Sequence, residues 1–189
     1  MEKVRTFIAV ELPEDIRERL EVVEKQLKSA NADVKWVALQ NFHITLKFLG
    51  SIDKDELTVV SEAMKRAIEG IPSFEITISH TGAFPRVSKP SVIWVGISDG
   101  TAQLKKLAGR LDSELELIGF EREKREFSPH ITMGRARSPQ GSERLRESIE
   151  ALKDMVIGVV PVREITLMRS DLGPKGSTYI PINKCALSD

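Results

Sequence analysis

Two short segments of the chain place a histidine and a threonine two positions apart. The segments are FHITLKFLG and SPHITMGR, and they contain the pairs His43/Thr45 and His130/Thr132. In a β-strand alternate side chains lie on one face, so each imidazole shares a face with its hydroxyl while the intervening isoleucine points to an apolar side. If the two strands face each other, all four side chains converge on one cleft.

Two imidazoles and two hydroxyls suit the hydrolysis of a cyclic phosphodiester. One group must remove a proton from water and another must protonate the leaving ribose oxygen. Histidine, whose ordinary pKa is about 6.5, can do either near neutral pH. Threonine hydroxyls can donate hydrogen bonds to the non-bridging phosphate oxygens, where charge must be stabilised. The scheme requires no metal, and two histidines without neighbouring carboxylate or cysteine ligands are too few for a zinc site.

The alternative for each histidine is a structural role, which is the commoner one for a single histidine in a strand. Here the motif occurs twice, in matched contexts, in a chain with three histidines, and this favours function. The third, His80, has no threonine two residues on and is predicted to lie at a strand end or on the surface. The single cysteine, Cys185, excludes an internal disulfide and is predicted to be a packed thiol.

Length and composition bound the class of protein. The chain has 189 residues, of which 41% are hydrophobic and 30% are charged, as in a soluble globular domain. No apolar run approaches the roughly 18 residues of a membrane-spanning helix, and the N-terminus lacks a signal-peptide pattern, so we expect a cytoplasmic protein. The 28 basic and 28 acidic residues balance. A nucleic-acid substrate is therefore expected to be contacted locally, at an end.

The spacing of apolar residues predicts the elements that must position the two motifs. The motif segments themselves are predicted strands, and the other elements lie before, between and after them. Helices are predicted from Pro13 to Leu27, from Asp53 to Gly70, from Leu104 to Gly119 and over 145–152, and strands over 4–10, 74–80, 92–97, 156–169 (which Pro161 could interrupt) and 178–183.

The order of these elements repeats. Strand, helix, His-x-Thr strand, helix and strand describe residues 4–80 and again residues 91–169. The offset that separates the two motif histidines also lays Phe7–Val10 over Trp94–Ile97, although the helices do not match at that offset. Repeat units usually need each other to bury their apolar faces. We therefore expect two lobes around a shared cleft.

This organisation predicts one bilobal domain over residues 1–189. Its approximate halves are 1–85 and 86–189, each with one His-x-Thr strand. The stretch TGAFPRVSKP (81–90) is the best candidate for a linker between the lobes, and RARSPQGS (135–142) is predicted to be a polar surface loop.

The chain resembles the bacterial and archaeal 2′-5′ RNA ligase / RNA 2′,3′-cyclic phosphodiesterase family of two-histidine phosphoesterases. The similarity spans nearly the whole chain, in RTFIAVELP, WVALQNFHITLKFLG, GAFPRVSKPSVIWVG, SPHITMGR and MRSDLGPKGSTY. It implies a bilobal, duplicated α+β fold, in which two antiparallel sheets line a central cleft and helices lie outside. It also implies an enzyme, without metal or cofactor, that opens the 2′,3′-cyclic phosphate of RNA 3′ ends to a 2′-phosphate, with 2′-5′ ligation as the reverse reaction. We expect a monomer that acts on tRNA halves or oligonucleotides, and the sequence does not determine the oligomeric state.

The resemblance further implies a role for each motif residue. His43 would be the general acid that protonates the 3′ leaving oxygen, and His130 the base that activates water. Thr45 and Thr132 would hold the phosphate. The near-symmetry of the motifs leaves the acid and the base interchangeable.

Phe48 and Arg135, each five positions after a motif histidine, match family positions implicated in substrate contact. Strict alternation along a strand places both on the face opposite the histidines. Phe48 would then belong to the core, and Arg135 would reach the cleft only through twist or a bulge, where its guanidinium could bind phosphate oxygens in bidentate fashion. The same alternation places Lys47 on the face of His43, either in contact with phosphate or solvated.

Several questions remain open at the level of sequence. Arg86 and Lys89 could guide RNA or be plain surface charge, and Tyr179 could line the cleft or pack. Rival functions are an RNA-end-binding protein without turnover, a phosphodiesterase for another small cyclic or 2′-5′-linked nucleotide, and a purely structural duplicated scaffold. The sequence does not distinguish the physiological RNA or the favoured direction of the reaction.

Overall fold

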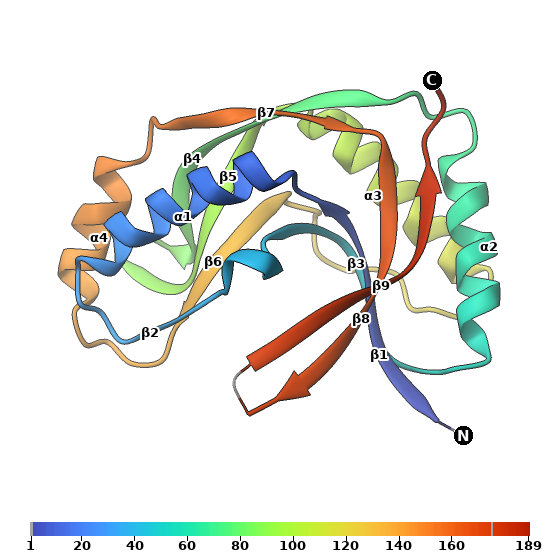
Figure 1. Cartoon of the computed structure of the whole chain (residues 1–189), viewed down its shortest axis with the longest axis horizontal. Coiled ribbons are helices and arrows are strands. Elements are labelled where there is room, and N and C mark those ends of the chain that lie inside the picture. Colours follow the sequence, from blue (N-terminus) through green and yellow to red (C-terminus); the bar gives the residue numbers. More distant parts are fainter. Residues whose placement is uncertain (1, 175) are drawn as a thin grey trace.

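The computed structural model describes residues 2–174 and 176–189 and contains the predicted alternation of strands and helices (Figure 1). The first half holds β1 (Lys3–Glu11), α1 (Glu14–Lys28), β2 (Val34–Trp36), the 3₁₀ turn η1 (Leu39–Asn41), β3 (His43–Asp53), α2 (Glu56–Ile68) and β4 (Phe74–Arg86). The second half holds β5 (Lys89–Asp99), α3 (Thr101–Glu116), β6 (His130–Ala136), α4 (Ser142–Ala151), β7 (Val156–Val162), β8 (Glu164–Gly173) and β9 (Gly176–Ala186).

The strands form a curled antiparallel sheet in the order β7-β4-β5-β6-β3-β1-β8-β9, with β2 paired to β6. The two expected sheets are the two arms of this arrangement. One arm is β7-β4-β5-β6 and the other is β3-β1-β8-β9, and they join where Ile44 of β3 pairs with Ile131 of β6. The two motif strands are thus neighbours at the centre of the sheet.

The helices lie outside the curled sheet (Figure 1). α1 packs with α4 near β7 and β4, and α2 packs with α3 near β3 and β9. Each pair therefore combines one helix from each half of the sequence. The main hydrophobic core runs continuously through both halves, and neither half closes its core alone.

The predicted helical stripes are confirmed. α1 buries Ile16, Leu20, Val23 and Leu27, and its acidic first turn and basic last turn complement the helix dipole. α2 begins later than the predicted start at Asp53, because that residue ends β3; its backbone N–H donates to the Glu56 carboxylate at 2.8 Å. No helix in the described part of the chain is long and apolar enough to cross a membrane.

The prediction of a linker over 81–90 is wrong. These residues end β4 and begin β5, which pair as far as Arg86 and Lys89 at the turn. The glycine and prolines of this stretch indicated a loop. Gly82 instead lies within β4, where its lack of a side chain leaves space for the Trp94 ring. The surface-loop prediction holds only after Ala136, where β6 ends.

The predicted strand over 156–169 is two strands. The break falls at Arg163 and not at Pro161, which lies within β7. β7 pairs with β4 in one arm of the sheet, and β8 pairs with β1 in the other. Proline is tolerated because β7 is an edge strand.

Candidate active site

Strand β3 carries a β-bulge directly after its motif. The residues on either side of Leu46 pair with consecutive residues of β1, so that Leu46 is extra. A bulge of this kind re-aims the side chains that follow it. Phe48 is 65% exposed, and its ring centre lies 6.1 Å from that of Phe7, beside His43. The prediction from strict alternation that Phe48 belongs to the core is therefore wrong.

Strand β6 carries a bulge at the equivalent position. Here Met133 is extra, because its two neighbours pair with consecutive residues of β5. Arg135 is exposed, and it lies close enough to His130 for its positive charge to lower the pKa of that imidazole. The bulge allowed for in the sequence prediction is thus present, and it returns Arg135 to the face of the motif.

The pairing also corrects the internal alignment of the two halves. Ala9 of β1 and Trp94 of β5 each stand opposite a motif threonine. The equivalent of Trp94 is therefore Ala9 and not Phe7, as the ungapped offset predicted. The shift is two residues, which preserves the face on which each side chain lies.

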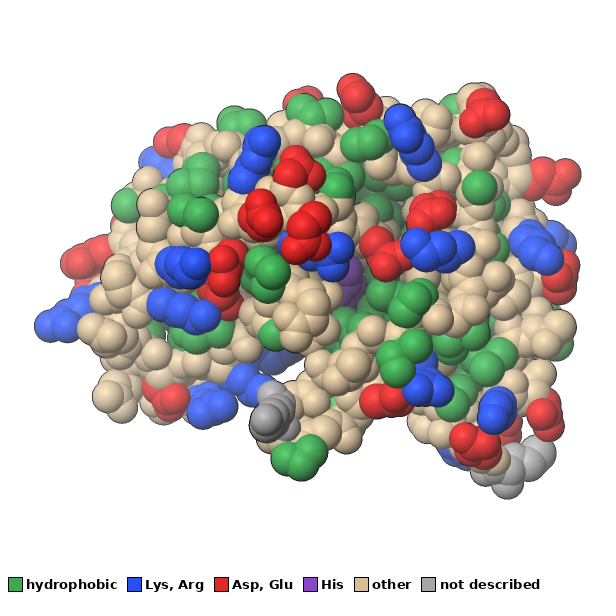
Figure 2. All heavy atoms as spheres, in the orientation of Figure 1, with side chains coloured by type: hydrophobic (Ala, Val, Ile, Leu, Met, Phe, Trp, Pro, Cys, Tyr) green, Lys and Arg blue, Asp and Glu red, His purple; other side chains and the backbone are tan. Residues whose placement is uncertain are grey.

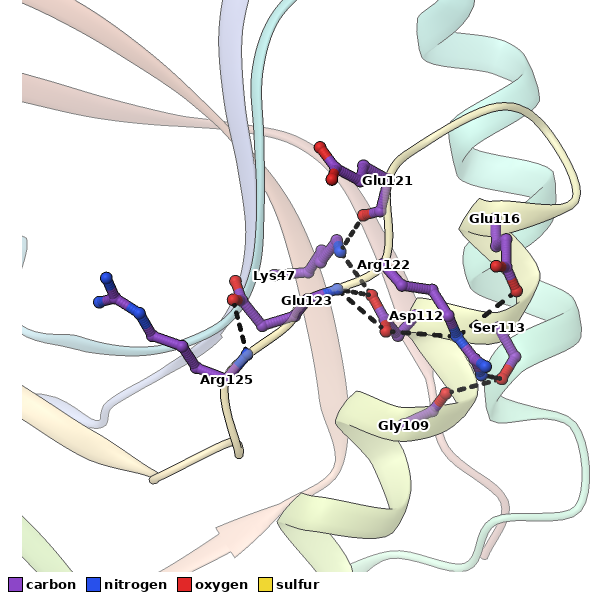
Figure 3. A network of polar contacts seen from close by, with 9 residues as sticks. All are labelled: Lys47, Gly109, Asp112, Ser113, Glu116, Glu121, Arg122, Glu123 and Arg125. Atoms are coloured by element: carbon purple, nitrogen blue, oxygen red, sulfur yellow. Dashed lines mark hydrogen bonds and ion pairs between the residues drawn. The ribbon is translucent and has the colours of Figure 1, made fainter.

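Lys47 does not contact the cleft. The bulge turns it into the interior, where it is 9% exposed, and both predicted environments are wrong. Its ammonium group pairs with the Asp112 carboxylate of α3 and donates to the Glu121 carbonyl at 2.7 Å (Figure 3). Asp112 also accepts from the Glu123 N–H at 3.2 Å. This network ties β3 to the segment that leads into β6 and His130.

The His43 ring is held in one orientation. Its Nδ1 lies 2.7 Å from the Asn41 carbonyl oxygen, which can only accept, so Nδ1 carries a hydrogen. In the neutral ring Nε2 is then the acceptor, and the Thr45 hydroxyl donates to it at 2.9 Å. The ring packs against Phe7 and Tyr179, with centroid distances of 4.8 and 5.2 Å. Tyr179 thus packs directly on the motif histidine.

His130 repeats this arrangement. Its Nδ1 donates to the Ser128 carbonyl, also at 2.7 Å, and the Phe84 ring meets it edge-on at 5.0 Å. The carbonyl two residues before each histidine therefore fixes the same tautomer in both strands. In the neutral His43 ring the Nε2 lone pair accepts from Thr45, and in both rings Nε2 is the nitrogen that can exchange a proton.

The pKa values of both histidines lie below the ordinary value. Burial lowers the pKa of His43 most; the hydrogen bond to Asn41 opposes this, and the charge of His130 lowers it further. Burial also lowers the pKa of His130, opposed by the bond to Ser128 and reinforced by Arg135. The charge of His130 thus acts on the pKa of His43, and the charge of Arg135 acts on the pKa of His130. Figure 2 shows a histidine in a recess near the centre of one face.

The remaining candidates have different outcomes. Arg86 and Lys89 lie at the β4–β5 turn. Cys185 is buried as predicted, and burial raises the pKa of its thiol, as in an unreactive cysteine. Across residues 2–174 and 176–189, no three His, Cys, Asp or Glu side chains converge as a metal site requires.

His80 is the residue that the sequence interpretation missed. It is neither at a strand end nor plainly on the surface, but half-buried within β4, with φ of 52°. Its ring lies beside Trp94 and over Gly96, where a side chain would collide with it. The signal in the sequence was Gly96, a glycine in the middle of a predicted buried strand, which marks the close approach of another group.

Comparison with known proteins places the chain in a family. The LigT like Phosphoesterase family matches it twice, over residues 10–94 and 95–179. The chain belongs to this family. Each match contains one of the two bulged His-x-Thr strands, so the family pattern covers both sides of the site.

Among similar LigT-like proteins, an RNA 2′,3′-cyclic phosphodiesterase of Methanothermobacter thermautotrophicus is 36% identical over 177 residues, 94% of this chain and 95% of the relative. One of Thermotoga maritima is 34% identical over 183 residues, 96% of this chain and 95% of the relative. The crystal structure of Escherichia coli LigT complexed with 3′-AMP has a TM-score of 0.78 and 28% identity, and the match covers 100% of both chains.

Proposed function

We propose that the protein hydrolyses the 2′,3′-cyclic phosphate at RNA 3′ ends to a 2′-phosphate. The observation that carries the proposal is the matched pair of bulged strands, which are neighbours in the sheet and each carry one His-x-Thr motif with the imidazole held through Nδ1 by a backbone carbonyl. Relatives named RNA 2′,3′-cyclic phosphodiesterase support the substrate. All four motif side chains come from one chain, so the site needs no second subunit.

The surroundings of the two rings support distinct roles. Arg135 opposes protonation of His130, which favours the neutral ring as the base that removes a proton from water. His43 is then the acid that protonates the 3′ oxygen as it leaves. Burial disfavours its charged form in the free protein, but an anionic phosphate entering the cleft would compensate that cost. The reverse sequence of proton transfers would join RNA ends through a 2′-5′ bond.

The neighbouring groups would bind the reacting phosphate and its nucleotide. The Thr45 and Thr132 hydroxyls can donate to the non-bridging oxygens, where negative charge grows. Arg135 offers a planar pair of N–H donors to the same oxygens. The exposed ring of Phe48 can stack against a base.

The test is turnover of a short RNA with a terminal 2′,3′-cyclic phosphate, in EDTA, with the product end identified. We expect a 2′-phosphate as the product. A 3′-phosphate would contradict the assigned regiochemistry. Tight binding of the RNA without any product would instead favour an end-binding protein, and turnover only of another cyclic or 2′-5′-linked nucleotide would move the activity to that substrate.

The pH dependence of kcat/KM should be bell-shaped, with its maximum below about pH 6.5. One histidine must be neutral and the other protonated, and the pKa values of both are lowered in the free protein. Activity therefore falls as rising pH removes the proton from the acid, and falls again as lower pH protonates the base. The measurement is kcat/KM from about pH 4 to 9.

Arg135→Gln provides the internal check on this profile. Loss of the guanidinium removes a cation that lowers the pKa of His130, so the acidic limb should move to higher pH. An unchanged limb would show that Arg135 does not act on the base. A descending limb well above pH 6.5 in the unmodified protein would contradict the lowered pKa values.

A further inference from the structure

A concave site lies on one side of His130. It is a cavity of about 260 Å³, and Ser128 and His130 form one of its walls. The cavity is therefore continuous with the reacting imidazole and with the carbonyl that orients it. None of the roles proposed above uses the other side chains that line it, which include His80, Trp94, Thr101, Lys105, Glu126 and Phe127.

Two glycines leave the space that two aromatic rings of this cavity occupy against the sheet. A side chain at Gly96 would collide with the His80 ring, and one at Gly82 would collide with the Trp94 ring. The two rings meet edge-to-face, with centroids 5.7 Å apart. Because both positions are glycine, the His80 and Trp94 rings can lie directly on the backbone of the neighbouring strand.

The backbone of His80 is strained to place its ring there. Its φ of 52° lies in the left-handed region, which costs a non-glycine residue on the order of 1 kcal/mol. The strained residue is the extra one in a β4 bulge, and its N–H donates to the Met155 carbonyl at 2.8 Å. Strained residues of this kind cluster at ligand sites.

The charges at the rim argue for a base and against a second phosphate. Lys105 and Glu126 pair at 2.6 Å, so that the positive charge there is already compensated. A phosphate site would offer uncompensated cations. Aromatic walls instead match a planar ring that has apolar faces and a polar edge. The Ser128 hydroxyl lies beside them, and the Thr101 hydroxyl, which donates to the Ile97 carbonyl at 3.2 Å, can still accept from such an edge.

We propose that this cavity binds a nucleobase of the RNA 3′ end while the cyclic phosphate lies between the two histidines. The proposal rests on the proposed function and adds the recognition of a base to it. His80 and Trp94 supply the stacking surface. The base belongs to the terminal or to the penultimate nucleotide, and the experiment below distinguishes them.

The experiment compares dinucleotides that carry a terminal 2′,3′-cyclic phosphate. One has both bases, one lacks the terminal base and one lacks the penultimate base. For wild type, kcat/KM should fall about tenfold when the base that enters the cavity is missing, since stacking of a base contributes on the order of 1–3 kcal/mol. The substrate that shows the loss identifies the nucleotide.

Two variants test the cavity itself. His80→Asn removes the ring and keeps a residue that tolerates the left-handed backbone, and Thr101→Met fills the mouth from α3. Each should raise KM about tenfold for the complete dinucleotide and have no further effect on the substrate that lacks the bound base. Gln103→Met, an exposed substitution on the same helix outside the cavity, should leave KM unchanged for both substrates.

Two outcomes separate this proposal from the proposed function. If His80→Asn and Thr101→Met affect substrates with and without a base equally, the base site is refuted while the activity stands. If wild type turns over none of the dinucleotides, the proposed function fails. Equilibrium binding of the same RNAs to wild type and to both variants then decides whether the cavity recognises a base.

Discussion

His43→Ala and His130→Ala should each lower kcat/KM for cyclic-phosphate RNA by about 10²- to 10⁴-fold. Each change removes one of the two proton transfers and leaves the rest of the cleft in place. Alanine has no ring nitrogen to bond the Asn41 or Ser128 carbonyl; the Ser128 carbonyl lies in an exposed segment, whereas Asn41 is buried, so folding is checked more closely for His43→Ala. The measurement is steady-state turnover of the RNA with both bases, with folding checked by circular dichroism.

The double variant sharpens this test. If the histidines act together on one phosphorus, removing both should cost little more than removing one, because residues of one catalytic unit are not additive. Thr45→Val and Thr132→Val, which keep the side-chain shape, should each cost less than a histidine. A double histidine variant that retained wild-type turnover would refute two-histidine catalysis.

Lys47→Met should destabilise the fold by about 3 kcal/mol. The substitution keeps most of the buried aliphatic volume but removes the buried cation that pairs with Asp112, which then keeps only the more exposed Arg122 at 3.7 Å. It also leaves the Glu121 carbonyl without its donor (Figure 3). The measurement is the midpoint of urea unfolding at an unchanged slope. Lys65→Met is the matched control, because its ion pair with Glu62 is exposed and should contribute less than about 1 kcal/mol.

Adding Asp112→Leu to Lys47→Met should restore part of the lost stability, because a mostly buried carboxylate that keeps only the 3.7 Å pair with Arg122 costs more than an apolar pair. Recovery should remain incomplete, since the Glu123 N–H also donates to Asp112. Equal losses for Lys47→Met and Lys65→Met would show that the interior pair contributes nothing special.

The alternation of side chains along a strand correctly placed His43 and Thr45 on one face of β3. It gave the wrong face for the residues that follow the bulge at Leu46. His43 and Thr45 precede the bulge in β3, so the period of two holds for them. Phe48 and Lys47 follow it, and their faces are exchanged. A bulge is set by pairing with a neighbouring strand, which a single sequence does not display. The matched bulge in β6 is the physical reason why Arg135 lies on the face of the motif.

The helices and the order of elements could be predicted from apolar spacing, because each amphipathic stripe is local. The pairing of distant elements could not. The sequence from 156 to 169 is uniformly suited to strands, yet it leaves one arm of the sheet at Arg163 and enters the other. The resemblance to a family supplied the two-armed architecture that periodicity alone left undetermined.

The exchange of helices between the two arms bears on how such a chain could arise. α1 packs with α4 and α2 with α3, so every outer layer draws on both halves of the sequence. A free-standing ancestral half with this connectivity would have lacked a partner for each of its helices. It would have needed a second copy of itself, with the cleft on the symmetry axis and one histidine from each subunit. Fusion of the two copies would then have let the inherited, equivalent positions diverge, into Phe48 on one side and Arg135 on the other.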